Sequence, residues 1–378
     1  MPTRRFAFPM WFGLVIVLAG CLRLTAAPPQ SVQVTATAPL AQEQPGVLDP
    51  GRATPPPTAT LLPSPTPAPT ATPRPSPTPS PSPTPSPMAP FTIEGLRSRD
   101  YPGGTIEIRS VLARTDTYTR YLIAYPSDGL TITGVMHVPA RGEGPFPVVI
   151  LNHGYIPPSR YWSGADTNRA AEYLVQHGYL TIAPDFRGWG GSDAGPNYFR
   201  TGLVIDVLNL ISSLPSLPQA DPERVGMWGH SMGGGITTKA IVVDPRIRAA
   251  VLYAPVSAND REVIERWGGG PRPPNVPREV WRAYKRAQDD PTFLRLTSPI
   301  YYMELVTAPV QIHQGTADRV TPPAWAEAIR DALIAAGKEV EYYAYEGQGH
   351  AFRGQAWLAF LERTREFFDR TLKQEPHG

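Results

Sequence analysis

The 378-residue sequence contains a single cysteine, Cys21, which excludes a framework of disulfide bonds. No group of cysteines and histidines has the spacing of zinc ligands either. An excess of charge of one sign is also lacking, since 35 Lys and Arg residues face 33 Asp and Glu residues and leave a formal net charge of +2. A dedicated nucleic-acid-binding protein would carry a concentrated basic surface. We therefore expect no structural zinc site and no nucleic-acid partner.

The longest apolar run, Phe6–Ala19, follows Arg4 and Arg5 and is short. A helix needs about 20 apolar residues to span a bilayer, so this run is typical of a signal peptide. It ends in Leu18-Ala19-Gly20-Cys21, which resembles the lipobox of bacterial lipoproteins, where the cysteine thiol is lipidated and becomes the new N-terminus. We predict a signal peptide at residues 1–20, lipidation of Cys21 and a location at the membrane, outside the cytoplasm. An ordinary signal peptide or an uncleaved anchor are the alternatives.

Proline is unevenly distributed: 16 of the 47 prolines fall in the 40 residues 51–90. Proline lacks an amide donor and fixes φ near −65°, so this tract favours extended polyproline II and cannot build a core. At about 3.1 Å per residue, the tract could reach roughly 120 Å. We predict that residues 21–90 form a disordered tether that holds a domain away from the membrane. A linker with no required length is the alternative.

Residues 91–378 differ in composition and are numerous enough to bury a sizeable hydrophobic core. Apolar runs come first without helices between them and then alternate with helical patterns. This order predicts an α/β domain in which antiparallel strands lead into a mostly parallel sheet with helices on both faces. The absence of an internal repeat argues against a propeller or solenoid. The predicted strands are Thr105–Leu112, Tyr118–Tyr125, Thr131–Val138, Val148–Asn152, Leu180–Ala183, Val225–Trp228, Ala249–Tyr253, Val310–Gln314 and Val340–Tyr345, and helices are expected near Asp166–Gln176, Thr201–Leu210, Gly233–Val243, Ala324–Ala336 and Gln355–Leu372.

The sharpest motif is Gly229-His230-Ser231-Met232-Gly233, which lies between an apolar strand and a helix. A G-x-S-x-G motif in that context predicts a nucleophile elbow, a tight turn that projects the Ser231 hydroxyl above the sheet. Gly229 and Gly233 lack β-carbons that would collide across such a turn. The motif alone is weak evidence, and its position between strand and helix strengthens it.

A serine hydroxyl needs a base, and the base needs an acid to orient it. Asp318 follows a predicted strand and a glycine turn, and His350 lies on a glycine-rich loop after the last strand. The chain order Ser231, Asp318, His350 is that of α/β-hydrolases, so we predict these three as nucleophile, acid and base. Glu346 is the alternative acid. The remaining histidines lack such a context; of these, His230 is expected to pack under the turn and His313 to be structural.

A buried strand ends in Asn152-His153-Gly154-Tyr155. In this fold, the loop after that strand supplies one amide of the oxyanion hole and the residue after the nucleophile supplies the other. We therefore predict the amides of Tyr155 and Met232 as oxyanion donors and expect His153 to hydrogen-bond to the loop. A plain turn at the end of the strand is the alternative interpretation.

With these residues assembled, residues 131–370 resemble the α/β-hydrolase superfamily, and within it the catalytic domain of the prolyl oligopeptidase family and the dienelactone-hydrolase-like esterases. Prolyl oligopeptidases carry a large propeller that screens peptides by size, whereas this sequence offers a signal, a tether and a hydrolase domain. The resemblance therefore implies ester hydrolysis more than peptide cleavage. The likeness depends on the motifs His153-Gly154, Asp185-Phe186-Arg187-Gly188-Trp189-Gly190-Gly191-Ser192-Asp193, Gly229-His230-Ser231-Met232-Gly233, Ser298-Pro299-Ile300, Ala308-Pro309 through Asp318 to Pro323, and Gly347-Gln348-Gly349-His350-Ala351-Phe352.

Between the strand ending at Tyr253 and the next strand, residues 258–297 form an insertion with two expected short helices, which we predict to be a lid over Ser231. Aromatic residues there and beyond the oxyanion loop are candidate substrate contacts, or they simply pack the insertion onto the domain. The sequence thus predicts a surface-tethered serine hydrolase that cleaves carboxylic esters without a metal or organic cofactor. A peptidase acting on short peptides and a non-catalytic binding lipoprotein are the alternatives. The candidate substrate contacts are Tyr161, Trp162, Trp267 and Trp281.

Overall fold

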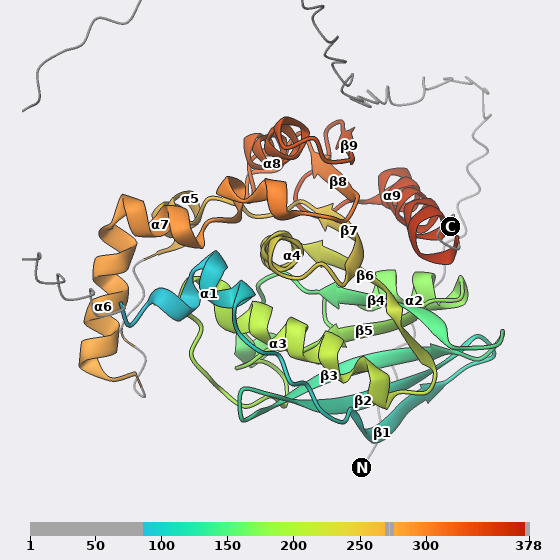
Figure 1. Ribbon diagram of the computed structural model, residues 1–378. Coiled ribbons are helices and arrows are strands. Elements are labelled where there is room, and N and C mark those ends of the chain that lie inside the picture. Colours follow the sequence, from blue (N-terminus) through green and yellow to red (C-terminus); the bar gives the residue numbers. More distant parts are fainter. Residues whose placement is uncertain (1–85, 269–271, 273–275, 375–378) are drawn as a thin grey trace, which may run out of the picture. The chain divides into compact units, whose positions relative to one another are not determined.

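The computed structural model describes residues 86–268, 272 and 276–374, and Figure 1 shows their arrangement. The predicted signal peptide, Cys21 and the tether up to residue 85 lie outside the described residues. Within the described part of the chain, no helix has the length and apolarity needed to cross a bilayer.

One sheet of nine strands organises the described domain, in the order β1-β2-β3-β5-β4-β6-β7-β8-β9. Strands β1, β2, β3 and β5 pair antiparallel, whereas β5, β4 and β6 to β9 run parallel to one another. The predicted antiparallel start and mostly parallel sheet are confirmed. The strands are β1 Glu107–Arg114, β2 Tyr118–Ser127, β3 Leu130–Pro139, β4 Phe146–Asn152, β5 Leu180–Pro184, β6 Ala220–His230, β7 Ile247–Tyr253, β8 Val310–Gly315 and β9 Val340–Tyr345.

Helices cover both faces of the parallel strands, as predicted (Figure 1). In β4 every residue is buried, and its side chains alternate between two hydrophobic cores. Val148 and Ile150 pack with residues of α3, α4 and α8, whereas Val149 and Leu151 pack with residues of α2 and α9. A strand covered on both faces must be apolar at successive positions. These helices span α2 Asn168–Gln176, α3 Thr201–Ser213, α4 Met232–Val243, α8 Pro323–Ala335 and α9 Gly354–Phe368.

The described residues of the insertion between β7 and β8 form three α-helices, whereas two were expected: α5 Asp260–Trp267, α6 Arg278–Asp289 and α7 Pro291–Thr297. The extra boundary arises at Asp290-Pro291. Proline cannot continue a preceding helix, because it lacks the amide donor and its ring clashes with the turn before it. The Asp290 side chain then caps α7 by accepting a hydrogen bond from the amide of Thr292.

Described residues before Phe91 take part in the packing of the domain. Met88 is 1 % exposed and packs in a third hydrophobic cluster with Phe199 and with Leu294 of the insertion. A short helix that the sequence did not predict, α1 Ile93–Arg97, follows and buries Ile93. The start of the domain therefore packs against the insertion.

Candidate active site

Ser231 lies in a sharp turn between β6 and α4, with φ 54° and ψ −114°. Positive φ is uncommon and costly for a residue other than glycine, and such strain accumulates at functional sites. The two glycines of the motif make the turn possible, because a β-carbon on Gly229 would lie 2.2 Å from the carbonyl oxygen of Gly233. The predicted need for these glycines is confirmed, and the turn has the geometry of a nucleophile elbow.

Asp318 and His350 meet at the carboxyl ends of the neighbouring parallel strands β8 and β9. His350 Nδ1 lies 2.8 Å from Asp318 Oδ2. The Asp318 side chain is fully buried and also accepts hydrogen bonds from the amides of Val320 and Thr321 and from the Thr321 hydroxyl. Burial raises the pKa of Asp318. The hydrogen bond and charge of His350, together with hydrogen bonds from the Thr321 hydroxyl and the Val320 amide, outweigh the effect of burial and lower the pKa to about 2. The carboxylate is therefore ionised at neutral pH and can orient the imidazole.

A pocket of about 600 Å³ opens at this edge of the sheet. It brings together Ser231, His350 and the two residues predicted as oxyanion donors, Tyr155 and Met232. Met232 is the first residue of α4, and the amides of a first helical turn have no partner within the helix. Among the described residues, no hydrogen bond joins the Ser231 hydroxyl to His350; catalytic hydrogen bonds often tighten only when substrate is bound. The pocket is lined by Tyr155, Arg200, Ser231, Met232, Val256, Val263, Trp267, Val320 and His350.

The loop that carries Tyr155 is fixed by two neighbours. The amide of Gly154 donates to Asp166 Oδ2 at 2.7 Å. Nδ1 of the buried His153 ring lies 2.7 Å from the carbonyl oxygen of Gly154, and Nε2 lies 3.2 Å from that of Asp185. A neutral ring donates to only one of these oxygens, and the shorter contact, to Gly154, is the expected hydrogen bond to the loop. Burial lowers the pKa of His153. Its ring therefore holds the loop in place.

Of the four predicted substrate contacts, the structure places only Trp267 in the lining of this pocket. Tyr161 donates its hydroxyl hydrogen to Asp185 Oδ1 at 2.8 Å. Trp162 is 54 % exposed beside Arg120, and Trp281 packs on the ring of Tyr284 within the insertion. The contacts of Tyr161 and Trp281 favour the alternative interpretation, in which these aromatics pack the domain.

Sequence reasoning missed two polar residues at the site. Arg200 lines the pocket from a left-handed backbone position, and its guanidinium contacts Asp260 of α5 at 2.5 Å. Asp166, expected only as a helix start, bonds both to the oxyanion loop and to His230. His230 is buried and stacked on Tyr253, as expected for a residue packed under the turn. Neither Arg200 nor Asp166 belongs to a motif that could have pointed to it.

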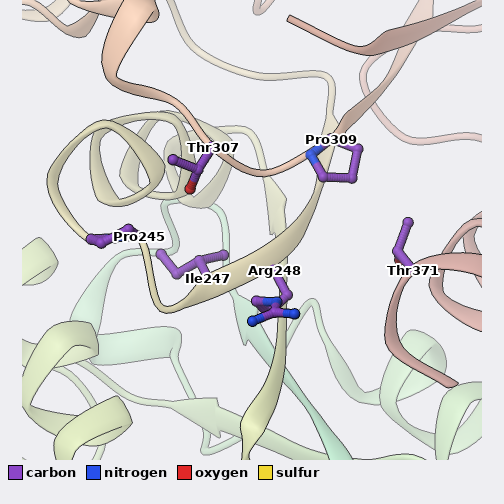
Figure 2. A pocket seen from close by; sticks show the side chains of 6 residues that line it. All are labelled: Pro245, Ile247, Arg248, Thr307, Pro309 and Thr371. Atoms are coloured by element: carbon purple, nitrogen blue, oxygen red, sulfur yellow. The ribbon is translucent and has the colours of Figure 1, made fainter. Parts of the chain in front are cut away.

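A second cavity, of about 470 Å³, lies at the amino ends of β7 and β8, the edge opposite Ser231 (Figure 2). Arg248 of β7 and Thr371 of the C-terminal segment contribute side chains to it, together with Pro309. None of its lining residues is a serine, cysteine, histidine or carboxylate. The chemistry therefore belongs to the pocket at the carboxyl ends of the strands.

The sequence matches known proteins over this same region. The model of the prolyl oligopeptidase family matches residues 166–375, more than half of the chain, and this segment includes Ser231, Asp318 and His350. The esterase FrsA of Yersinia enterocolitica is 27 % identical over 137 residues, which are 34 % of this chain and 30 % of that esterase. The chain thus spans less than a third of the length of that relative.

Two solved structures are similar to the fold. An acetyl xylan esterase from Paenibacillus sp. R4 superposes with a TM-score of 0.56 at 20 % identity, covering 74 % of this chain and 92 % of that one. The acylaminoacyl peptidase of Pyrococcus horikoshii gives a TM-score of 0.55 at 22 % identity, covering 69 % and 43 %. At these identities the likeness shows the fold alone, which is that of the α/β-hydrolases.

Proposed function

The chain belongs to the prolyl oligopeptidase family and is a serine hydrolase of the α/β-hydrolase fold, and we propose that it cleaves carboxylic esters through an acyl-enzyme on Ser231. One observation carries the proposal: a buried, ionised Asp318 holds Nδ1 of His350 at 2.8 Å, and the pocket that His350 lines also contains Ser231.

In the first step, Nε2 of His350 takes the proton of Ser231 Oγ as the oxygen attacks the ester carbonyl. Asp318 keeps the proton of His350 on Nδ1 and stabilises the imidazolium that forms. The C–O bond to the leaving group then breaks, and the imidazolium gives its proton to the departing alkoxide. Alcohol leaves, and the acyl group stays on Ser231.

In the second step, water attacks the acyl-enzyme by the same series of proton transfers. His350 accepts a proton from water, the hydroxide attacks the acyl carbon, and Ser231 regains its proton as the carboxylic acid departs. In both steps the negative oxygen would be held by the amides of Tyr155 and Met232. Because Met232 begins α4, the positive end of the helix dipole adds to that stabilisation.

The lining of the pocket favours esters over the amino ends of peptides. Apart from His350, Arg200 is the only charged residue among the described side chains that line it, and none of them carries a carboxylate. An enzyme that binds a peptide by its amino terminus needs an acidic group to pair with the ammonium. Cleavage of short peptides, which the family name suggests, is the competing function.

The first experiment uses a fluorophosphonate probe on the full chain, with Ser231→Ala as the control. We expect stoichiometric labelling of Ser231 in the wild-type protein and none in the variant. An unlabelled wild-type protein would contradict the enzyme proposal and leave the non-catalytic alternative. A panel of acyl p-nitrophenyl esters and peptide amides then separates the two activities, and turnover of the peptides alone would replace the esterase proposal.

We also propose that Cys21 is lipidated and that the chain acts outside the cytoplasm, tethered to a membrane. The support is the sequence: two arginines, an apolar run, the Leu18–Cys21 motif and the proline-rich tract that follows. A single acyl chain binds membranes only marginally, so stable anchoring needs the two or three chains of bacterial lipoproteins.

This location can be tested in bacterial cells fed an alkyne-tagged fatty acid. The parent protein should carry the label and sediment with membranes, whereas Cys21→Ser should lose the label. A Cys21→Ser protein that is still labelled and processed like the parent would refute the lipidation, and so would a parent protein found wholly soluble in the cytoplasm.

A further inference from the structure

Each ring nitrogen of His230 faces a group that can only accept a hydrogen bond. Nδ1 lies 2.8 Å from Asp166 Oδ2 and 3.0 Å from Oδ1, and Nε2 lies 3.1 Å from the main-chain carbonyl oxygen of His350. A neutral imidazole has one N–H, whereas an imidazolium has two. Both contacts can therefore be hydrogen bonds only when His230 carries a positive charge.

This ion pair is only partly buried, because the Asp166 side chain is 24 % exposed. His230 is 7 % exposed, and its ring stacks on Tyr253 with centroids 4.4 Å apart. Burial lowers the pKa of His230. The charge and hydrogen bond of Asp166, the hydrogen bond to the His350 carbonyl and the charge of Asp318 outweigh the effect of burial, so the pKa is raised. Burial likewise raises the pKa of Asp166, yet His230, the Gly154 amide and His153 bring it to about 2.

The pair contacts both loops that the chemistry needs. Asp166 Oδ2 accepts the amide hydrogen of Gly154, the residue before Tyr155, and His230 reaches the backbone of His350. The packing is tight, since a β-carbon on Gly154 would lie 3.1 Å from Asp166 Oδ2 and 3.3 Å from both His230 Nδ1 and Ser231 Cβ. Ser231 itself follows His230 directly in the chain.

We propose that Asp166 and His230 are positioning residues, a fixed carboxylate–imidazolium pair that holds the oxyanion loop at Gly154 and the base loop at His350 against the nucleophile turn. The inference rests on the proposed function, because it explains how groups from three separate loops keep one geometry. Neither residue contacts the Ser231 hydroxyl; Asp166 acts through the backbone of Gly154, and His230 acts through the backbone of His350 and through its ring, whose centroid lies 4.8 Å from that of His350. Loss of the His230 proton at alkaline pH leaves Nε2 without a hydrogen to donate, which frees the base loop.

The charge can be measured without any substrate. In nitrogen-15-labelled full-length protein, the ring nitrogens of His230 are assigned by their disappearance in His230→Gln. At about pH 7.5, where an ordinary histidine with a pKa near 6.5 is mostly neutral, both should show imidazolium shifts and directly bonded protons. A neutral tautomer at this pH would overturn the proposal, even if the enzyme hydrolyses esters.

The positioning role is tested with Asp166→Asn. Asparagine tolerates the left-handed backbone of residue 166, where φ is 71°, and its oxygen can still accept from Gly154, so the change removes mainly the charge. We expect kcat on an ester to fall about 10- to 100-fold with KM little changed, since a small misplacement of reacting groups has effects of that size. The alkaline decline of kcat should also be lost, because the asparagine Nδ2 can donate to Nδ1 of a neutral His230 and so keep the ring hydrogen on Nε2. Wild-type kcat with an unmoved alkaline limb would overturn the role.

The two proposals fail differently. Wild-type protein that does not label at Ser231 would refute the serine chemistry and the positioning role that depends on it. Wild-type protein that labels normally, but whose Asp166→Asn variant labels at the same rate, would refute the positioning role alone.

Discussion

Gly233 packs against the end of β4 so closely that a β-carbon on it would lie 1.9 Å from the carbonyl oxygen of Asn152. This contact seats the first turn of α4 on the strand that leads into the oxyanion loop. Asn152 and Gly233 thereby fix the distance between the two amides proposed to stabilise the oxyanion. Gly233 is therefore required by a neighbouring strand, whereas Gly229 is required by the turn itself.

Gly233→Ala should therefore prevent the elbow from closing. A backbone atom cannot move aside as the end of a side chain can, so we expect a loss of several kcal/mol of stability, at the upper end of single-residue effects, or failure to fold. Thermal unfolding of Gly349→Ala is the matched control, because a β-carbon there would meet no atom within 4 Å. Equal melting temperatures for the two variants would contradict the argument.

Asp318 and the rejected candidate Glu346 can be compared directly. Asp318→Asn should lower kcat by about 10³- to 10⁴-fold, because His350 loses the charge that fixes its tautomer. Glu346 is exposed, so Glu346→Gln should leave kcat within about twofold of wild type. Steady-state ester hydrolysis measures both, and loss of turnover in the Glu346 variant alone would reassign the acid.

The acid side of the pH profile should report on His350. Only a neutral imidazole can take the proton of Ser231, so kcat/KM should fall with slope one as the pH decreases. Asp318 cannot cause this fall, because its pKa of about 2 keeps it ionised well below pH 4. Measurement between about pH 4 and 9, with circular dichroism to verify folding, tests this; a flat profile from about pH 5 to 8 would count against His350 as the base.

Much of this fold was accessible from the sequence because its signals are local. All nine predicted strands form, since an apolar run such as Val148–Leu151 between turn residues is typical of a buried parallel strand. Ser231, Asp318 and His350 could be selected because each follows such a strand. Parallel strands place their carboxyl ends at one edge, so the topology itself brings these residues near one another.

The site residues that could not be predicted from the sequence owe their roles to contacts between distant segments of the chain. Asp166 and His230 are 64 positions apart, and no spacing rule connects them. Arg200 reaches the pocket because Phe199 and Arg200 both have left-handed backbone conformations. Neither position is a glycine, so the sequence does not indicate this turn. Of the predicted substrate contacts only Trp267 lines the pocket, because exposure and side-chain direction decide which aromatic faces it, and residue type predicts neither.

A buried charge cluster attaches the insertion to the nucleophile helix. Asp260, the first residue of α5, contacts Lys239 of α4 at 3.0 Å and Arg200 at 2.5 Å, and the side chains of Asp260 and Lys239 are at most 3 % exposed. Burial lowers the pKa of Lys239 to about 8, with a further lowering from Arg200 and an opposing rise from Asp260. The single carboxylate thus pairs with two cations.

Asp260→Asn should for that reason destabilise the protein more than Lys239→Met. Removing the carboxylate leaves the buried Lys239 and the partly exposed Arg200 without their ion pair, at a cost of about 3–5 kcal/mol, whereas Lys239→Met leaves Asp260 paired with Arg200. In Asp260→Asn the folded-state pKa of Lys239 should fall below about 8, so stability should rise with pH from that lowered pKa up to the unfolded-state pKa of about 10.4. Denaturant unfolding at pH 7 and 9 tests both statements, and an equal loss in the two variants would contradict them.

Two half-exposed tryptophans offer the sharpest test of where substrate binds. Trp267 is 49 % exposed, lines the pocket and packs edge-on to Trp325, whereas Trp162 is 54 % exposed and does not line the pocket. Trp267→Ala should raise KM for esters with a bulky acyl or alcohol group by roughly tenfold, which corresponds to about 1.4 kcal/mol of lost apolar contact. The kcat for a short acetyl ester should hardly change, because Ser231 and His350 are untouched.

Trp162→Ala is the matched control for the loss of an exposed aromatic ring and should leave both constants at wild-type values. If Trp162→Ala raised KM and Trp267→Ala did not, the substrate would extend along the oxyanion loop instead of under α5.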